Sequence, residues 1–363
     1  MTSPLAPQGH LERLLRTLFR RAQIVSIAPL GEDAGGDDTR KGGGYSEPLL
    51  VTLRDGKVQR QLVFRTASPN DFGHDRRADR AANLLLAHDT FAAIPNHIRA
   101  LDVGAIAGDG TLVSLHDSGE FYLLTSFAEG TLYADDLRRV SQEGVATAED
   151  LGRCEALADY LVHLHSHRGG RHAAYTRSVR DLVGSGEGIF GIVDGYDEEV
   201  PGASRRRLQT IEKLCLDWRW RLRGRESRLC RIHGDFHPFN LLFAHGTDLA
   251  LLDASRGGLG DPADDVTCLA VNYVFFAIDH PDAWSGGLGP LWRRFWSRYL
   301  DRSGDSGLLE VAAPYLAWRC LVVACPRFYP DLTADGRDRL LTLAERALQA
   351  QRFEATMAEE LAR

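Results

Sequence analysis

The chain has 363 residues, of which 44% are hydrophobic and 26% charged, and its formal net charge is -7. This length exceeds what a single hydrophobic core supports, so we expect two domains, and the composition is that of a folded protein. The negative charge argues against nucleic acid as a partner and favours a cationic or neutral small molecule, although it also serves plain solubility.

The sequence also argues against a membrane protein and against a disulfide-rich protein. No run of about 18 apolar residues is present, and the first residues lack a charged segment followed by an apolar one, so we expect a cytoplasmic protein without a membrane partner. The six cysteines form no C-x-x-C pair and are read as buried thiols. Nothing in the chain indicates an oligomeric state.

The first 126 residues alternate short apolar segments with polar turns, which predicts a small α+β lobe. A glycine-rich polar loop at 31–44 separates the first strand from the next two, which are joined by the turn at 54–57. We expect helices at 10–22 and 74–87, and strands at 24–30, 48–53, 61–66, 101–106 and 120–126 that complete one sheet.

Residues 127–363 change character and predict a larger, mostly helical lobe, with the linker between the lobes at about 124–130. Short apolar strands at 229–232, 241–243 and 249–252 interrupt the helices. The helices are expected at 149–165, 205–228, 264–276, 288–302, 308–324 and 333–352.

Two turns among these strands carry the chemistry. The segment Arg231-Ile-His-Gly-Asp-Phe-His-Pro-Phe-Asn-Leu-Leu-Phe243 contains Asp235 and Asn240, and Asp253 ends the following strand. Phosphoryl transfer needs a carboxylate that orients and deprotonates a hydroxyl, and oxygen ligands for Mg²⁺. Asp235 fits the first role, and Asn240 and Asp253 fit the second.

The pattern His-Gly-Asp-x-x-x-x-Asn followed by a strand-end Asp resembles the aminoglycoside phosphotransferase (choline kinase-like) family, which has a two-lobed protein-kinase-like fold. The resemblance covers about residues 24–350 and is specific at 233–265, with Gly234 where eukaryotic protein kinases have Arg. It implies Asp235 as catalytic base and Asn240 and Asp253 as Mg²⁺ ligands. The expected activity is transfer of the γ-phosphate of ATP (or GTP) to a hydroxyl of an aminoglycoside-like or other small alcohol.

Several neighbours of the motif have expected supporting roles. The resemblance implies that the segment 260–265 buttresses the catalytic loop. Asp261 should cap the helix that begins near residue 264, since aspartate is a preferred N-cap residue. His233 and His237 are expected to hold the loop by hydrogen bonds rather than to bind a metal.

The residues expected to bind the nucleotide differ from the pattern of the family. Arg65 stands at the strand end where the family has a lysine, and Asp79 is the best candidate for its carboxylate partner; the alternatives are a solvated arginine and a charged helix face. The resemblance places adenine at the backbone of Ser126, Phe127 and Ala128. Since the first lobe has no G-x-G-x-x-G or G-x-x-x-x-G-K-[ST] motif, P-loop and Rossmann interpretations fail, and 42–46 either covers the phosphates or is a surface loop.

The sequence does not identify the molecule that accepts the phosphate. The acidic stretch 187–199 could line its cleft and favour a cationic substrate, or it is a solvated loop. A rival interpretation is a non-catalytic nucleotide-binding or regulatory protein on the same fold, motivated by Arg65 and the irregular glycine loop. A protein kinase is disfavoured because the segment after Asp253 is too short for a peptide platform.

Overall fold

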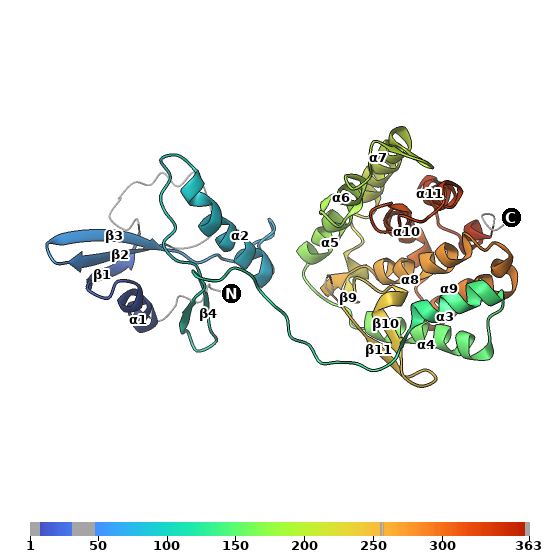
Figure 1. Cartoon of the computed structure of the whole chain (residues 1–363), viewed down its shortest axis with the longest axis horizontal. Coiled ribbons are helices and arrows are strands. Elements are labelled where there is room, and N and C mark those ends of the chain that lie inside the picture. The colour runs from blue at the N-terminus through green and yellow to red at the C-terminus, as the bar shows by residue number, and fades with distance from the viewer. Residues whose placement is uncertain (1–7, 31–47, 255, 257, 360–363) are drawn as a thin grey trace. The chain divides into compact units, whose positions relative to one another are not determined.

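The computed structural model describes residues 8–30, 48–254, 256 and 258–359, and it separates into two compact units, Met1–Thr125 and Ser126–Arg363. Small antiparallel sheets occupy the first unit, and the second is mostly helical (Figure 1). The predicted α+β class is therefore confirmed. Each unit has a hydrophobic core of its own.

The first unit is built on a three-stranded antiparallel sheet in the order β1 (Gln23–Pro29), β2 (Leu49–Asp55) and β3 (Val58–Phe64). Its hairpin turns at Gly56, whose φ of 61° suits a residue without a Cβ. These strands match the predicted ones to within a few residues.

One face of this sheet is covered by α1 (Gln8–Leu18). Leu11 and Leu15, four residues apart on the helix, bury their side chains against Val51 and Leu53 of β2. The helical spacing of apolar residues at 10–22 thus predicted the right element, and its burial makes a small separate core.

The remainder of the first unit differs from the prediction. After α2 (Arg77–Thr90) and the short turn η1 (Phe91–Ala93), β4 (Gly104–Ile106) pairs with β5 (Leu112–Ser114) and not with the three-stranded sheet. The two strands form a local hairpin, whose tight turn is closed by a hydrogen bond from the amide of Gly110 to the carbonyl of Ala107.

The strand predicted at 120–126 was wrong. Residues 120–129 form no strand in the described structure, and Leu123 and Leu124 are each 88% exposed. A short apolar run becomes a strand only where a neighbouring strand pairs with it. None of the described strands pairs with this segment.

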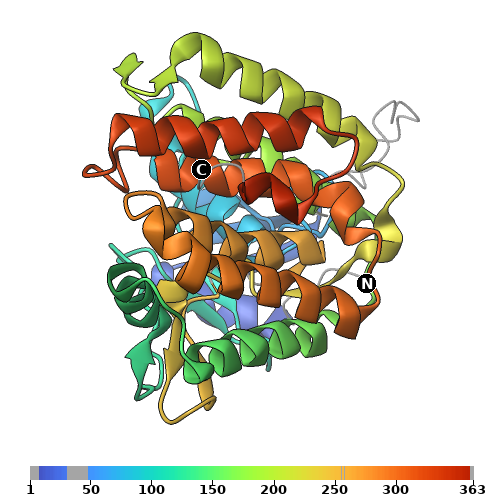
Figure 2. The same ribbon diagram turned by 90° about the vertical axis from the view of Figure 1, so that its right-hand side faces the viewer.

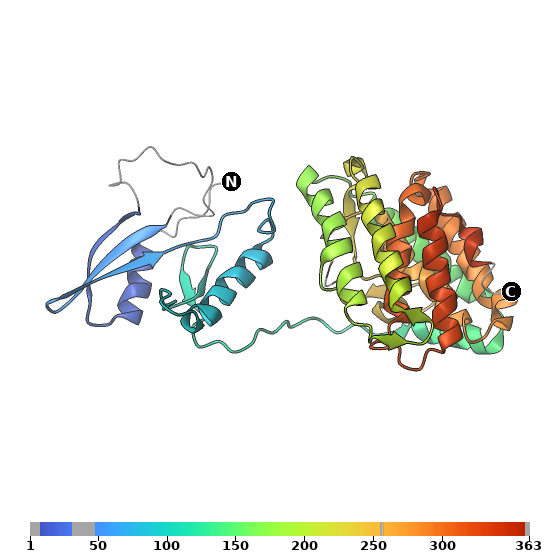
Figure 3. The same cartoon turned by 90° about the horizontal axis from the view of Figure 1, so that it is seen from above.

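Helices dominate the second unit and pack side by side (Figures 2 and 3). None of the described helices is long and apolar enough to span a bilayer. The helices are α3 (Tyr133–Glu143), α4 (Ala148–His165), α5 (His172–Gly184), α6 (Ile189–Val193), α7 (Arg205–Arg221), α8 (Pro262–Ala277), α9 (Gly289–Ser303), α10 (Leu308–Ala324) and α11 (Ala334–Gln349), with shorter turns η2 (Glu226–Arg228), η4 (Trp284–Leu288) and η5 (Ala355–Ala358).

Local sequence signals explain where these helices begin. Thr147 caps α4 in a capping box with Asp150, and Asp261 caps α8, whose first residue is Pro262. The predicted cap at Asp261 is confirmed. The helix predicted at 205–228 ends earlier, at Arg221. Gly224 follows with a φ of 82°, a left-handed conformation typical of the residues just past a helix C-terminus.

The core of the second unit lies around α8 and α10, both of which are buried on almost every side. α10 packs between α8 and α11, and α9 packs against α4 and α8 (Figure 2). Buried aromatic side chains fill the spaces between these helices, among them those of Trp218, Trp292 and Trp296. A polar residue on α8 or α10 is therefore fixed in place by close packing.

Short strands hold two loops next to this core. β9 (Cys230–Ile232) pairs with β12 (Gly258–Gly260), while β10 (Leu241–Phe243) pairs with β11 (Leu249–Leu251) and with β6 (Thr131–Leu132). The loop 233–240 joins β9 to β10, and the loop after β11 leads to β12. Both loops are thus anchored at each end, which positions the predicted motif; a further small ribbon pairs β7 (Glu199–Val200) with β8 (Ala203–Ser204).

Candidate functional site

Gly234 sets the course of the loop between β9 and β10. Its φ is 85°, and a Cβ at this position would lie 2.8 Å from the backbone carbon of Arg256. Both the left-handed backbone and the close approach of the second loop therefore require glycine.

Gly234→Ala is accordingly expected to lower the free energy of unfolding by about 1–3 kcal/mol through backbone strain. Chemical denaturation monitored by fluorescence measures this change. Gly246→Ala, in the exposed hairpin between β10 and β11, also has a positive φ but meets no atom within 4 Å, so it is the matched control and should lose less. Equal losses for the two variants would contradict the steric argument.

Asp265, in the first turn of α8, anchors the same loop. Its two carboxylate oxygens accept the backbone amides of His233 and Gly234, at 2.8 and 2.7 Å. His165 Nε2 lies 3.1 Å from Asp265 Oδ2, and the other ring nitrogen of His165 contacts Tyr299 at 2.8 Å. The segment 260–265 thus supports the loop through Asp265.

The ionised form of Asp265 is favoured despite its complete burial. Burial alone would raise the pKa of this carboxyl, but the contact with His165 and the two backbone amides lower it. A carboxylate that accepts two backbone hydrogen bonds is held in one orientation, so the loop that begins at His233 is held as well.

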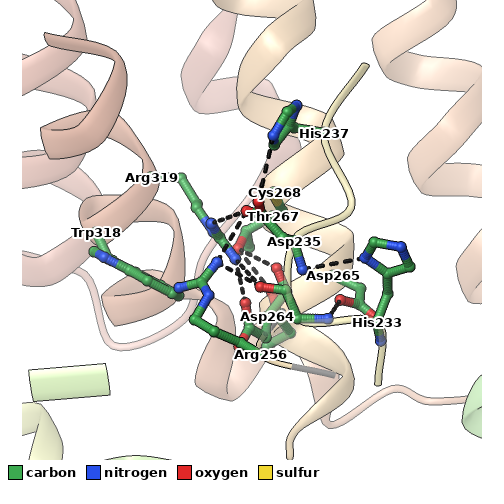
Figure 4. Close-up of polar contacts among 12 residues, drawn as sticks. His233, Asp235, His237, Arg256, Asp264, Asp265, Thr267, Cys268, Trp318 and Arg319 are labelled. Atoms are coloured by element: carbon green, nitrogen blue, oxygen red, sulfur yellow. Dashed lines mark hydrogen bonds and ion pairs between the residues drawn. The ribbon is translucent and has the colours of Figure 1, made fainter. Parts of the chain in front are cut away.

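Asp235 projects from the middle of the loop into a group of polar side chains (Figure 4). Arg256 Nη2 donates to its Oδ1 at 3.0 Å, and His237 Nε2 lies 3.4 Å from its Oδ2. Burial alone would raise the pKa of this carboxyl, but His237, Arg319 and Arg256 together hold it well below its usual range. The group is therefore a carboxylate at neutral pH.

Asn240 closes the loop beside Asp235, as the five-residue spacing predicted. It ends the one-turn η3 (Pro238–Asn240), and its Nδ2 donates to the backbone carbonyl of Asp235 at 3.0 Å. His237 accepts the amide of Phe239 and so holds the loop, which is the role predicted for it. The amide nitrogen of Asn240 thus faces Asp235, while none of the described residues donates a hydrogen bond to its side-chain oxygen.

Asp253 lies two residues after the end of β11 at Leu251. The amide of Leu252 donates to the carbonyl of Asn240 at 2.9 Å, so the end of this strand lies against the end of the loop. Asp253 is exposed and has a φ of 39°, a backbone conformation that non-glycine residues adopt at a cost of about 1–3 kcal/mol. Strain of this kind concentrates at functional sites.

Two arginines of the site were missed by the sequence analysis. Arg256 donates to Asp235 and to the carbonyl of Gly234, and Arg319 of α10 also reaches both. Both guanidinium groups lie over the ring of Trp318, with their Cζ atoms 4.4 and 3.9 Å from the centroid. A signal for Arg319 existed, because it is a single basic residue in the otherwise apolar stretch 311–324.

Of the acidic stretch 187–199, Glu187 lies beside this group. Its Oε2 is 3.8 Å from Arg256 Nε, and its backbone carbonyl accepts the indole N–H of Trp318 at 2.9 Å. Glu187 is 75% exposed at its side chain, so its carboxylate is available to a ligand as well as to Arg256.

The residues predicted for the nucleotide lie in the first unit or at its boundary. Arg65 directly follows β3 and is exposed. Asp79 accepts the backbone amide of Arg76 at 2.9 Å and thereby caps α2. Phe127 is 88% exposed in the extended segment that also contains Ser126 and Ala128. The predicted phosphate loop 42–46 lies outside the described residues.

A magnesium ion fits the residues of the two loops. The described residues contain no group of three or more His, Cys, Asp or Glu side chains that could hold a metal. Mg²⁺ does not need such a group, because it commonly takes one or two carboxylates together with phosphate oxygens and water. The exposed carboxylate of Asp253 and the free amide oxygen of Asn240 are donors of this class.

Comparison with known proteins gives one family match. The model of the phosphotransferase enzyme family matches residues 42–300, more than half of the chain. No curated protein matches significantly.

Among solved structures, a glucosamine kinase is 14% identical, with 91% of this chain and 94% of that chain covered and a TM-score of 0.43. The choline kinase LicA from Streptococcus pneumoniae is 14% identical, with 94% and 98% covered and a TM-score of 0.36. A macrolide 2'-phosphotransferase type I is 16% identical, with 96% and 99% covered and a TM-score of 0.31. These scores are too low to bear on function.

Proposed function

Since the chain belongs to the phosphotransferase enzyme family, we propose that it transfers the γ-phosphate of ATP or GTP to a hydroxyl group of a small molecule. Membership of the family confirms the resemblance carried by residues 233–265, and with it the expected fold class. The observation that carries the proposal is the Asp235 side chain held beside Asn240 on a loop anchored at both ends.

Asp235 is the catalytic base of the proposed reaction. The transition state of phosphoryl transfer is loose, so a carboxylate acts mainly by aligning the hydroxyl and accepting its proton late in the reaction. Because its pKa is lowered, the carboxyl is ionised before the acceptor arrives and can orient the hydroxyl.

Asn240 and Asp253 are the proposed ligands of Mg²⁺, Asn240 through its side-chain oxygen and Asp253 through its carboxylate. The bound cation would neutralise charge on the phosphate oxygens. The chain's own contribution is to hold the two ligands at the ends of neighbouring segments, where the Leu252 amide ties β11 to the loop.

The nucleotide is proposed to use the first unit and its boundary. Arg65 would bind phosphate oxygens with its planar donor fork, with Asp79 as the carboxylate that orients it. The backbone groups of Ser126, Phe127 and Ala128 would meet the base. Asp79 would have to serve this purpose together with its observed contact to the amide of Arg76.

Arg65→Ala is expected to raise the KM for the nucleotide by about tenfold, the loss of about one charge-assisted hydrogen bond to phosphate. Steady-state kinetics at saturating acceptor measure the change. Arg60→Ala, at an exposed position on the same strand β3, is the matched control and should change the KM little. Equal effects of both variants would assign the loss to general surface charge.

A panel assay tests the proposed function. Consumption of ATP and of GTP is followed with aminoglycosides, macrolides, nucleosides, amino alcohols and sugars, each with Mg²⁺ and with a chelator. We expect nucleotide consumption that depends on one class of acceptor and on Mg²⁺, and a phosphorylated acceptor detectable by mass spectrometry. A folded protein that is inert with the whole panel would count against the proposal.

A non-catalytic nucleotide-binding or regulatory protein is the second candidate, favoured by Arg65 in place of the family's lysine. It predicts nucleotide binding that does not require Mg²⁺, with no turnover in the panel. Isothermal titration with a non-hydrolysable nucleotide, with and without Mg²⁺, separates it from the enzyme.

A further inference from the structure

Arg319 is a buried arginine in the helix at the centre of the second unit. Its side chain is 6% exposed, and its Nε is buried without a hydrogen-bond partner among the described residues. Burying a guanidinium group costs several kcal/mol even when it is paired, and an unsatisfied N–H adds about 1–3 kcal/mol. A packed apolar side chain would serve the stability of α10 better, so the contacts of Arg319 point to another purpose.

The contacts of Arg319 converge on the loop that carries the proposed base (Figure 4). Nη1 lies 3.4 Å from Asp235 Oδ1, and Nη2 donates to the carbonyl of Gly234 at 3.1 Å. Nη2 also donates to Asp264 Oδ1, which partly balances the buried charge. One guanidinium group thus holds both the side chain of the base and the backbone directly before it.

Trp318 keeps this guanidinium group in place. The Cζ atom of Arg319 lies 3.9 Å from the centroid of the indole ring, and the indole N–H donates to the carbonyl of Glu187 at 2.9 Å. Because the ring is itself anchored and buried, the arginine side chain has little freedom to rotate.

The two oxygens of Asp235 consequently have unequal surroundings. Oδ1 faces two guanidinium groups, those of Arg256 at 3.0 Å and Arg319 at 3.4 Å, both of which are charge-assisted donors. Oδ2 faces Asn240 Nδ2 at 3.3 Å and His237 Nε2 at 3.4 Å, and no arginine contacts this oxygen among the described residues. Both arginine contacts therefore fall on Oδ1, and Oδ2 is the oxygen of Asp235 on the side of Asn240.

We infer that Arg319 is a positioning residue of the proposed reaction, which clamps Oδ1 of Asp235 and the Gly234 carbonyl so that Oδ2 faces the acceptor hydroxyl. This inference rests on the proposed function. As the acceptor oxygen bonds to the γ-phosphorus, the bond from that phosphorus to the bridging oxygen breaks, and the nucleoside diphosphate leaves with the bonding electrons. Oδ2 takes the hydroxyl proton.

The first test compares Arg319→Gln and Arg319→Lys. Misplacing a catalytic group by about 1 Å can cost roughly 100-fold in rate, so Arg319→Gln should lower kcat by about 10- to 100-fold. The KM for the acceptor should change by less than about threefold, because Arg319 does not touch substrate. Lysine retains the charge without the fork and should restore part of kcat. An unchanged kcat in Arg319→Gln would overturn the inference.

A double-mutant cycle asks whether Arg319 acts through Asp235. In an Asp235→Asn background, Arg319→Gln should reduce the remaining rate by less than about twofold, since residues that act as a unit are strongly non-additive. Additive losses in the double variant would overturn the inference and leave Arg319 as a residue of stability alone.

Arg337 of α11 is the matched control. It is equally buried, at 4% exposure, and donates to the backbone carbonyls of Ala324 and Pro201, away from the loop. Arg337→Gln should lower the melting temperature as Arg319→Gln does, but leave kcat unchanged at a temperature where both variants are folded. A loss of kcat in Arg337→Gln as large as in Arg319→Gln would overturn the inference.

A crystal structure of Arg319→Gln decides the point without any substrate. We expect the Asp235 side chain to rotate and the Gly234 carbonyl to shift relative to the wild-type crystal structure; an unchanged loop would overturn the inference. Inactivity of the wild type across the acceptor panel would instead remove the proposed function, so the two failures can be told apart.

Discussion

Asp235→Asn is expected to lower kcat by roughly 10²- to 10⁴-fold, the range that general-base groups contribute. Asparagine keeps the shape of the side chain but cannot accept the hydroxyl proton, and its amide nitrogen would face donors at either oxygen position. Steady-state kinetics with the acceptor identified in the panel measure the loss. The KM for the nucleotide should stay within a factor of about three, because Asp235 is not proposed to contact the nucleotide.

A control separates this loss from the mere removal of a carboxylate. Asp248 lies in the exposed hairpin between β10 and β11 of the same unit, so Asp248→Asn should leave kcat unchanged. Circular dichroism should show both variants folded. Retention of half or more of the wild-type kcat in Asp235→Asn would remove this residue from the proposed mechanism.

Asp265→Asn is expected to lower the free energy of unfolding by about 3–5 kcal/mol, as breaking a buried charged network does. One oxygen cannot accept the amides of both His233 and Gly234, and the new amide nitrogen would point its own hydrogens at one of them. The substitution also removes the anionic partner of His165. Denaturation in guanidinium chloride measures the change, and kcat should fall too because the loop is released.

The pH dependence of stability gives this prediction a second readout. The pKa of Asp265 is lowered in the folded state, so its contribution is present above the unfolded value and is lost as the pH falls through the folded one. The stability difference between wild type and Asp265→Asn should therefore shrink as the pH is lowered below about 4. A constant difference down to about pH 2 would contradict the assignment.

Asp150 provides the control for Asp265. It is also buried, caps α4 through Thr147 and pairs with Arg139, but it lies away from the loop. Asp150→Asn should destabilise the protein by about 1–2 kcal/mol without lowering kcat. A comparable loss of kcat in both variants would show that kcat follows global stability and not the anchoring of the loop.

Local sequence patterns were sufficient to predict many structural features of the chain. The cap at Asp261, the glycine at 234 and the five-residue spacing from Asp235 to Asn240 specify backbone conformations that depend on a few neighbouring residues. α5 could also have been predicted, since the apolar positions Tyr175, Val179 and Leu182 recur at helical spacing.

The pairing of strands that lie far apart in the sequence could not be predicted from such local patterns. The run 120–126 has strand-like residues but no partner among the described strands, and 104–106 formed a local hairpin instead of joining the larger sheet. Strand formation depends on cross-strand neighbours, which a single sequence does not reveal.

The reaction class could be read from the amino-acid sequence without coordinates, because Asp235, Asn240 and Asp253 lie on two short segments whose spacing is characteristic of phosphoryl transfer. The surroundings of Asp235, the proposed base, became visible only in the folded chain. Arg319 is 84 positions from Asp235, and nothing local connects them. The packing of α10 against α8 brings the arginine to the loop, since side-chain contacts at such separation arise from the arrangement of helices and not from any neighbouring residues.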